Sequence, residues 1–196
     1  MMNQDVIGVV AALIGIYAFF PYLRDIFRGK THPHIFTWTV WTLLMLIGFT
    51  AQITEGAGPG AWATGAFGLL NLSVVILALK YGEKSITRSD WIMLSLSLLA
   101  IPLWILTKSP LWSVILISVI DVIAFLPTFR KSWTKPHEET LETYLLVSLS
   151  VLLSFAALHA VTLTTVLYPA TLLGVNLVFV TLALIRRKQM GVAAEL

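Results

Sequence analysis

Seven apolar stretches of about 17 to 21 residues, separated by short polar segments, constrain this chain more than any other feature. At a rise of about 1.5 Å per residue, each stretch is long enough to cross the hydrocarbon core of a bilayer as a helix. The sequence therefore predicts an all-α integral membrane protein with seven transmembrane helices. The predicted helices cover residues 6–23, 35–53, 61–79, 91–107, 111–129, 144–161 and 165–185.

The composition agrees with this class and excludes several kinds of chemistry. Of the 196 residues, 58% are hydrophobic and only 12% are charged, about half the charged share of a soluble domain. The chain has no cysteine, which excludes disulfides, thiol catalysis and thiolate metal sites. Its four histidines are scattered without the spacing of a metal site. We therefore expect no metal and no cofactor.

Lysine and arginine residues fall almost entirely in every second connecting segment, which predicts how the chain is oriented in its membrane. Twelve of them lie on one side of the seven helices, and only Lys108 lies on the other. Because cytoplasmic loops are the basic ones, we expect the C-terminus in the cytoplasm and the N-terminus outside, in a prokaryotic-type plasma membrane. The twelve are Arg24, Arg28, Lys30, Lys80, Lys84, Arg88, Arg130, Lys131, Lys135, Arg186, Arg187 and Lys188.

The same distribution bears on the partners of the chain. A pI near 9.3 is typical of nucleic-acid-binding proteins, but here the basic residues lie in short loops, where membrane topology explains them. We expect the lipid bilayer as a partner and no nucleic acid. A homo-oligomer is left open.

An internal repeat emerges when the chain is aligned with itself. A shift of 106 residues aligns residues 18–24, AFFPYLR, with residues 124–130, AFLPTFR, and a shift of 105 aligns Asn71 with Asn176. Helices 1 to 3 and helices 5 to 7 are therefore predicted to be two three-helix bundles, joined by helix 4. With one helix between them, they form a parallel repeat. The first bundle, the linker and the second bundle span residues 1–82, 83–109 and 110–196.

This plan of three, one and three helices resembles the SWEET and PQ-loop (MtN3-like) transporter superfamily. Pro21 and Pro127 keep the proline of the family's Pro-Gln dipeptide, while Tyr22 and Thr128 replace its glutamine. Helices 2 and 6 lack the prolines that SWEET proteins carry there. The resemblance implies a transporter, not an enzyme, that moves a small polar solute, sugar-like or another small metabolite, by alternating access. Both uniport and proton coupling occur among such proteins.

Asn71 and Asn176 are the leading candidates for solute binding. Each lies near the middle of a predicted helix, where an amide without partners would cost several kcal/mol in hydrocarbon. One interpretation is an interhelical hydrogen bond worth about 0.6 kcal/mol. The other is a pair of amides that face each other across the repeat axis and bind the hydroxyls of a solute. The resemblance favours binding, because SWEET transporters bind substrate through an asparagine in each of these two helices.

Asp121 lies at the centre of helix 5 with no basic residue in the membrane core to pair with it. An isolated ionised carboxylate is costly there, so we expect it to be protonated or to line a wet cavity. It is a candidate for proton coupling or for substrate binding, and the alternative is a neutral carboxyl hydrogen-bonded to a neighbour. Its repeat counterpart is Gly15, so the acid breaks the symmetry.

Helices 2 and 6 carry a matching stripe of side chains on one face of each helix. Such stripes are usually packing surfaces, but Thr42, Met45 and Ser148 within this one are candidate substrate contacts. The stripe comprises Trp38, Thr42, Met45 and Phe49 in helix 2 and Tyr144, Ser148, Val151 and Phe155 in helix 6.

Pro21 and Pro127 are candidate gating hinges. Each removes a backbone donor and permits a kink, although a helix that ends at the proline would explain it equally well.

Two further classes of function compete with transport. A membrane receptor of the KDEL-receptor type shares the helix plan, but it would need a charged outer pocket, and the outward loops hold almost no basic residues. An intramembrane enzyme would need a paired acidic motif or a nucleophile motif, and the sequence shows neither.

Overall fold

The described part of the chain is helical. The computed structural model describes residues 3–83, 86–99, 102, 106 and 109–194, and no strand occurs among them. Two short 3₁₀ helices, Gly58–Ala61 and Pro136–Glu138, accompany the α-helices. The α-helices are α1 (Gln4–Phe27), α2 (Ile35–Thr54), α3 (Trp62–Tyr81), α4 (Arg88–Leu98), α6 (Pro110–Thr134), α7 (Leu141–Ala156) and α8 (Leu163–Ala194).

Five of the described helices are long and apolar enough to cross a membrane, which fits an integral membrane protein. They are α1, α2, α6, α8 and the continuous segment Gly58–Tyr81 that contains α3. The helix α7 is apolar but has only 16 residues, and it ends at Ala156 rather than at the predicted residue 161. It stops there because Leu158 turns inward and packs against Ala57 and Ala61. Of the predicted stretch 91–107, residues 100, 101, 103–105 and 107 lie outside the described residues.

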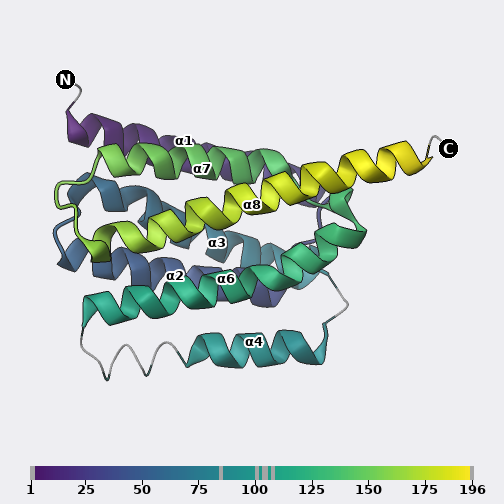
Figure 1. Ribbon diagram of the computed structural model, residues 1–196, viewed down its shortest axis with the longest axis horizontal. Helices are drawn as coiled ribbons and strands as arrows, with labels where there is room; N and C mark the ends of the chain where they lie inside the picture. The colour runs from purple at the N-terminus through teal and green to yellow at the C-terminus, as the bar shows by residue number, and fades with distance from the viewer. Residues whose placement is uncertain (1–2, 84–85, 100–101, 103–105, 107–108, 195–196) are drawn as a thin grey trace.

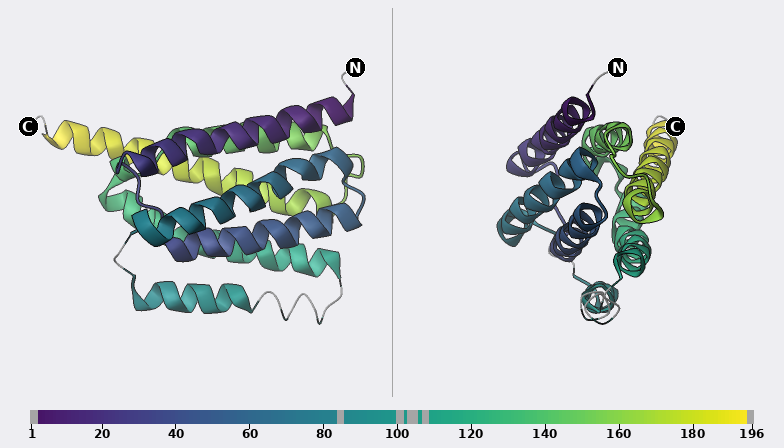
Figure 2. Two further views of the ribbon diagram at one scale, coloured as in Figure 1. Left: turned by 180° about the vertical axis from the view of Figure 1, so that it is seen from behind. Right: turned by 90° about the vertical axis from the view of Figure 1, so that its left-hand side faces the viewer.

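In chain order the helices around the core are α1 to α3 and then α6 to α8, which we call the two groups of helices, and α4 lies at the outer edge (Figures 1 and 2). In one group α3 contacts both α1 and α2, and in the other α8 contacts both α6 and α7. The groups meet where α1 packs on α7 and where α2 packs on α6. The helix α4 contacts α2 and α6 from outside, and the C-terminal part of α8 projects beyond the bundle (Figure 1).

Small residues let α1 and α7 approach closely. Ala11, Gly15 and Ala18 are buried on one face of α1. The Ser150 hydroxyl of α7 donates to the Ala11 carbonyl at 2.6 Å. A Cβ added at Gly15 would lie 3.0 Å from the Ser150 hydroxyl oxygen of α7 and 2.5 Å from the Phe67 ring of α3, so glycine lets α1 approach both helices. Such small-residue contacts are how helices pack without a hydrophobic drive between them.

One end of the bundle, near the start of α1, is tightly packed. A Cβ added at Gly8 would lie 2.5 Å from Pro59, and one added at Gly60 would lie 2.5 Å from Leu158. The Gln4 side-chain amide donates to the Leu158 carbonyl at 2.9 Å. These contacts leave no room between α1 and the two connecting segments, and we refer to this region as the closed end.

At the other end, which we call the basic end, hydrogen bonds join the two groups of helices. The Lys131 ammonium lies 2.9 Å from a Glu139 carboxylate oxygen and donates to the His32 carbonyl at 3.3 Å. The Thr140 hydroxyl donates to the Asp25 carboxylate at 3.0 Å. The bonds from Lys131 to His32 and from Thr140 to Asp25 join the two groups, while the Lys131–Glu139 pair lies within one of them.

Both candidate hinge prolines lie inside helices. The helix α1 continues past Pro21 to Phe27, and α6 continues past Pro127 to Thr134. The interpretation that a helix simply ends at each proline is therefore wrong. Each proline instead removes one hydrogen bond of its helix.

Candidate functional site

The structure brings the two asparagines and Met45 to one small cavity between the groups of helices. Its volume is about 40 Å³, room for two or three water molecules. Side chains from α1, α2, α3, α6, α7 and α8 contribute to its wall, so it lies where all six meet. The lining residues are Phe19, Trp38, Trp41, Met45, Phe67, Asn71, Phe125, Thr143, Tyr144, Val147, Leu172 and Asn176.

Asn71 and Asn176 present unsatisfied amides to this cavity. Both residues are buried, at 3% and 2% exposure. Neither side chain has a hydrogen-bond partner within the described part of the chain. The Thr143 hydroxyl, which also lines the cavity, is likewise without a partner there. The structure thus shows no hydrogen bond that would make the asparagines interhelical links, and their donors and acceptors are open to water or a solute.

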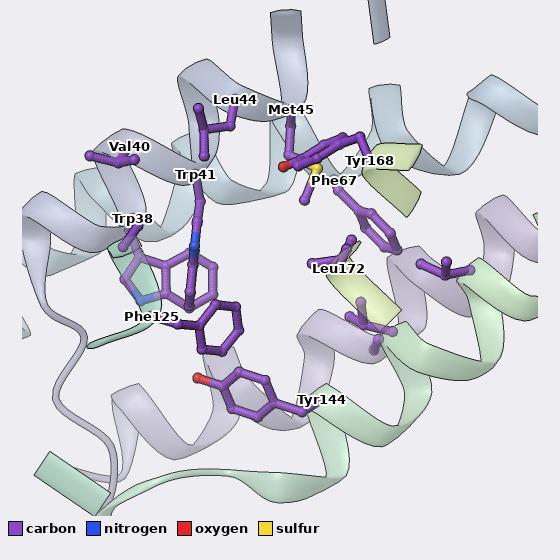
Figure 3. Packing of buried hydrophobic residues seen from close by; sticks show 14 of the residues in the cluster. Trp38, Val40, Trp41, Leu44, Met45, Phe67, Phe125, Tyr144, Tyr168 and Leu172 are labelled. Atoms are coloured by element: carbon purple, nitrogen blue, oxygen red, sulfur yellow. The ribbon is translucent and has the colours of Figure 1, made fainter. Parts of the chain in front are cut away.

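Aromatic rings make up half of the cavity wall. The Trp41 ring centroid lies 4.8 Å from that of Phe125 and 5.1 Å from that of Trp38. Phe125 and Tyr144 are 6.2 Å apart. Figure 3 shows the Trp41, Phe125 and Tyr144 side chains pointing toward one another from three helices. Flat apolar faces next to amide and hydroxyl groups suit a small molecule that has both C–H and polar groups.

Many of the lining residues occur in pairs at the spacing of the sequence repeat. Phe19 and Phe125 occupy the second position of the repeated AFxPxxR motif, and Trp38 and Tyr144 are likewise 106 residues apart. The asparagines are related by a shift of 105, as are Phe67 and Leu172. Residues that the sequence repeat pairs therefore line the same cavity.

Three of the predicted substrate-binding residues, Thr42, Ser148 and Asp121, do not line the cavity. The hydroxyls of Thr42 and Ser148 each donate at 2.8 Å to the carbonyl one turn earlier in their own helix. The face that turns inward is displaced from the predicted stripe, since Trp38, Trp41 and Met45 follow the spacing i, i+3 and i+7. A role of Thr42 and Ser148 in substrate contact stays a prediction.

Asp121 is fully buried behind the cavity rather than within its wall. The Trp41 indole and the Tyr168 hydroxyl are its polar neighbours. No group in the described residues meets hydrogen-bond geometry at either carboxylate oxygen, at the Trp41 N–H or at the Tyr168 hydroxyl. Trp41 is the shared element, because its ring lines the cavity while its side chain also interacts with Asp121.

A second, more polar pocket opens at the basic end. Its volume is about 170 Å³, and it shares Trp38 and Tyr144 with the central cavity. These two rings therefore separate the pockets. We call it the vestibule; its lining is Tyr22, His34, Thr37, Trp38, Glu83, Pro127, Thr128, Arg130, Lys131, Thr134, Lys135, Glu139 and Tyr144.

Sequence reasoning missed most of the aromatic wall and Thr143. The repeat motif carried a usable signal, because it already paired Phe19 with Phe125. The stripe interpretation took Trp38 and Tyr144 as packing residues, whereas both line the cavity. Thr143 is paired by the repeat with Thr37, but Thr37 lines the vestibule. The repeat therefore gave no signal that Thr143 lies at the central cavity.

No group of histidine, cysteine or acidic side chains suited to a metal ion occurs in the residues that the structure describes. Comparison with known proteins adds no relative: no family model, no curated protein and no solved structure matches this chain.

Proposed function

We propose that this chain is a membrane carrier that moves a small, uncharged polar solute by alternating access. The carrying observation is the pair of unpartnered asparagine amides, from equivalent positions of the two groups of helices, at one cavity between them. In this proposal seven helices cross the membrane, with the N-terminus outside and the C-terminus in the cytoplasm. The basic end is then cytoplasmic, as the distribution of lysine and arginine favours.

The contacts between helices support two repeats of three helices, similar to the SWEET plan. The third helix of each group contacts the other two, and the groups meet through α1 with α7 and α2 with α6. Under the repeat these two interfaces are equivalent. Rocking of one bundle against the other about the central cavity would open the two ends in turn.

The packing of the two ends supports access from the cytoplasmic side in this conformation. The closed end is filled by Gly8, Pro59, Gly60 and Leu158, whereas the vestibule leaves about 170 Å³ at the basic end. A solute entering the vestibule meets Trp38 and Tyr144 before it reaches the asparagines. These rings must move, because the central cavity of about 40 Å³ is too small for a sugar-sized molecule.

The chemistry of the wall supports a neutral solute. None of the described residues around the cavity is charged, so an ionic solute would lose its hydration without gaining a counter-ion. The two amides and the Thr143 hydroxyl would replace water around the polar groups of the solute, and the rings would cover its apolar faces. The described residues of this wall include no acid pair and no nucleophile motif, so we do not propose an enzyme. They also carry no charge, whereas a receptor of the KDEL type would need a charged pocket.

Binding can be tested through the tryptophans that line the cavity. The protein in lipid nanodiscs is titrated with monosaccharides, nucleosides and neutral amino acids while tryptophan fluorescence is recorded. We expect a saturable change for one class of solute, reduced by Trp41→Phe, which removes a cavity fluorophore. The exposed Trp112 provides the control, since Trp112→Phe removes a tryptophan outside the cavity and should leave the change intact. Saturable binding that survives Trp41→Phe and both asparagine replacements would rule out this site.

A further inference from the structure

A surface groove runs along α8 and the end of α6 at the basic end. It encloses about 450 Å³, more than the central cavity and the vestibule together. Its apolar floor consists of Leu177, Val178, Leu182 and Ile185, which share one face of α8. Val178 is 59% exposed, so the floor is open to the surroundings. The polar members, nearer the end of α8, are Trp133, Thr181, Arg186 and Gln189.

Arg186 is held in place at the head of this groove. Its guanidinium stacks over the Trp133 ring, 4.4 Å from the centroid, and its Nε donates to the Trp133 carbonyl at 3.1 Å. Its Nη1 donates to Gln189 Oε1 at 2.8 Å. The remaining N–H groups of the guanidinium, and the amide N–H groups of Gln189, make no hydrogen bond to the described part of the chain.

Arg186 differs from three basic residues of the same end, each of which is paired with a carboxylate. Arg130 lies 3.5 Å from Asp90, Lys131 lies 2.9 Å from Glu139, and Lys135 lies 3.4 Å from Glu138. Within the described ranges, no carboxylate lies in ion-pair range of Arg186. A fixed guanidinium with unused donors is the group that binds phosphate best in proteins.

We propose that this groove binds an anionic phospholipid. The phosphate accepts hydrogen bonds from the Arg186 guanidinium and from the Gln189 side-chain amide. One acyl chain lies along Leu182 and Val178, with the glycerol region near Thr181. Charge at the membrane surface and chain burial in the groove then act together, as they do in basic lipid sites between helices. Because the groove is formed by α6 and α8, the lipid would brace the contact between these helices.

A second copy of the chain is the competing occupant, and the charges argue against it. A two-fold dimer over this groove would place the same patch of both subunits face to face. Each Arg186 would then approach the other, and no acidic residue lines the groove to compensate. An anionic lipid instead brings a negative phosphate to the positive charge of Arg186.

The test compares lipids that differ only in headgroup. Detergent-purified protein receives phosphatidylglycerol or phosphatidylcholine with identical acyl chains, and native mass spectrometry counts the lipids retained while thermal unfolding is followed. We expect one phosphatidylglycerol to be retained in preference and to raise the unfolding temperature. Arg186→Gln should weaken that retention about tenfold or more, the range for a charge-assisted contact. Val178→Trp, which fills the floor, should weaken it as well.

Matched controls separate this site from general effects. Arg28→Gln removes an exposed charge at the same end, and Leu72→Trp adds the same ring to an exposed position of α3; both should retain phosphatidylglycerol like the wild type. Should Val178→Trp fail to fold, Arg186→Gln alone decides. Equal retention of both lipids, or unchanged retention in Arg186→Gln, would refute the proposal. So would equal stabilisation by inorganic phosphate without lipid, or a lipid-independent dimer that Val178→Trp dissociates.

Discussion

For Asn71 and Asn176, a structural role and a binding role predict opposite effects of substitution on stability and on solute binding. An interhelical hydrogen bond would be lost on substitution, whereas an amide that faces only the cavity contributes nothing to the folded protein. We expect Asn71→Leu and Asn176→Leu to leave the unfolding temperature unchanged or higher, because leucine adds apolar surface, while solute binding weakens by about 1–3 kcal/mol. Thermal unfolding in one detergent and fluorescence titration measure the two effects.

A positive control for that comparison is Ser150→Ala. The Ser150 hydroxyl makes a real interhelical hydrogen bond to Ala11, so its loss should lower stability by about 0.6 kcal/mol, up to about 2. If the asparagine variants instead lose stability as Ser150→Ala does and bind solute normally, these amides are structural.

In the proposed carrier, Asp121 is the residue whose substitution would distinguish uniport from proton coupling. Its neighbour Trp41 also lines the cavity, so a change of protonation at the carboxyl would alter the binding of a solute there. If Asp121 carries a proton with the solute, Asp121→Asn should retain exchange but abolish accumulation driven by a pH gradient. Uptake into liposomes with and without that gradient measures this, and Ser118→Ala, one turn away on α6, is the control. Wild-type uptake that ignores the gradient would leave a uniporter.

At the scale of elements, α4 depends on one buried carboxylate. Burial opposes ionisation of Asp90, but hydrogen bonds from the Thr87 N–H and hydroxyl, each 2.7 Å long, and the nearby His34 and Arg130 outweigh it, so the pKa of Asp90 is lowered. A carboxyl with a lowered pKa stabilises the folded state above its unfolded pKa of about 3.9, and this contribution is lost as pH falls through the folded pKa.

Asp90→Asn should therefore destabilise the protein by about 1–3 kcal/mol at pH 7. The difference from wild type should shrink as the pH falls below about 4, where the wild-type carboxyl also becomes neutral. Thermal unfolding across that pH range measures the effect. Glu138→Gln, which removes one member of the partly exposed pair with Lys135, should change stability by less than about 0.5 kcal/mol at either pH. A constant Asp90→Asn difference at all pH values would contradict the argument.

How far the sequence predicts these elements depends on the kind of information it carries. Long apolar runs predicted α1, α2, α3 and α6 within about five residues, because hydrophobic length alone specifies a helix in lipid. They also predicted the start of α8, but this helix continues past the predicted residue 185 to Ala194. The early end of α7 could not be predicted, since it depends on packing of Leu158 against another loop. The positions of Trp41 and Thr143 at the cavity, and the burial of Thr42 away from it, also depend on tertiary packing. A repeat in sequence indicates which positions correspond but does not fix which way each helix faces.

For the whole molecule, the arrangement of the two ends fixes where accessible labels can be placed. The chain has no cysteine, so single cysteines report cleanly. Val161, 74% exposed beyond α7, and Lys30, exposed after α1, lie at opposite ends of the bundle. We expect Val161→Cys to react with an impermeant maleimide on intact cells and Lys30→Cys to react only after permeabilisation. The unsubstituted protein is the blank, and reaction of both sites from one side would exclude the proposed topology.

In the proposed carrier, the uncharged wall of the central cavity would also determine how transport responds to voltage. A unit charge that crosses the membrane gains or loses about 2.3 kcal/mol per 100 mV. A neutral solute, bound by Asn71 and Asn176 in a wall whose described residues carry no charge, moves without that contribution. Unless Asp121 carries a proton across with it, the flux is the same in polarised and depolarised membranes. The concentration difference of the solute would then set the direction of transport, and the membrane potential would drive neither accumulation nor export of the solute.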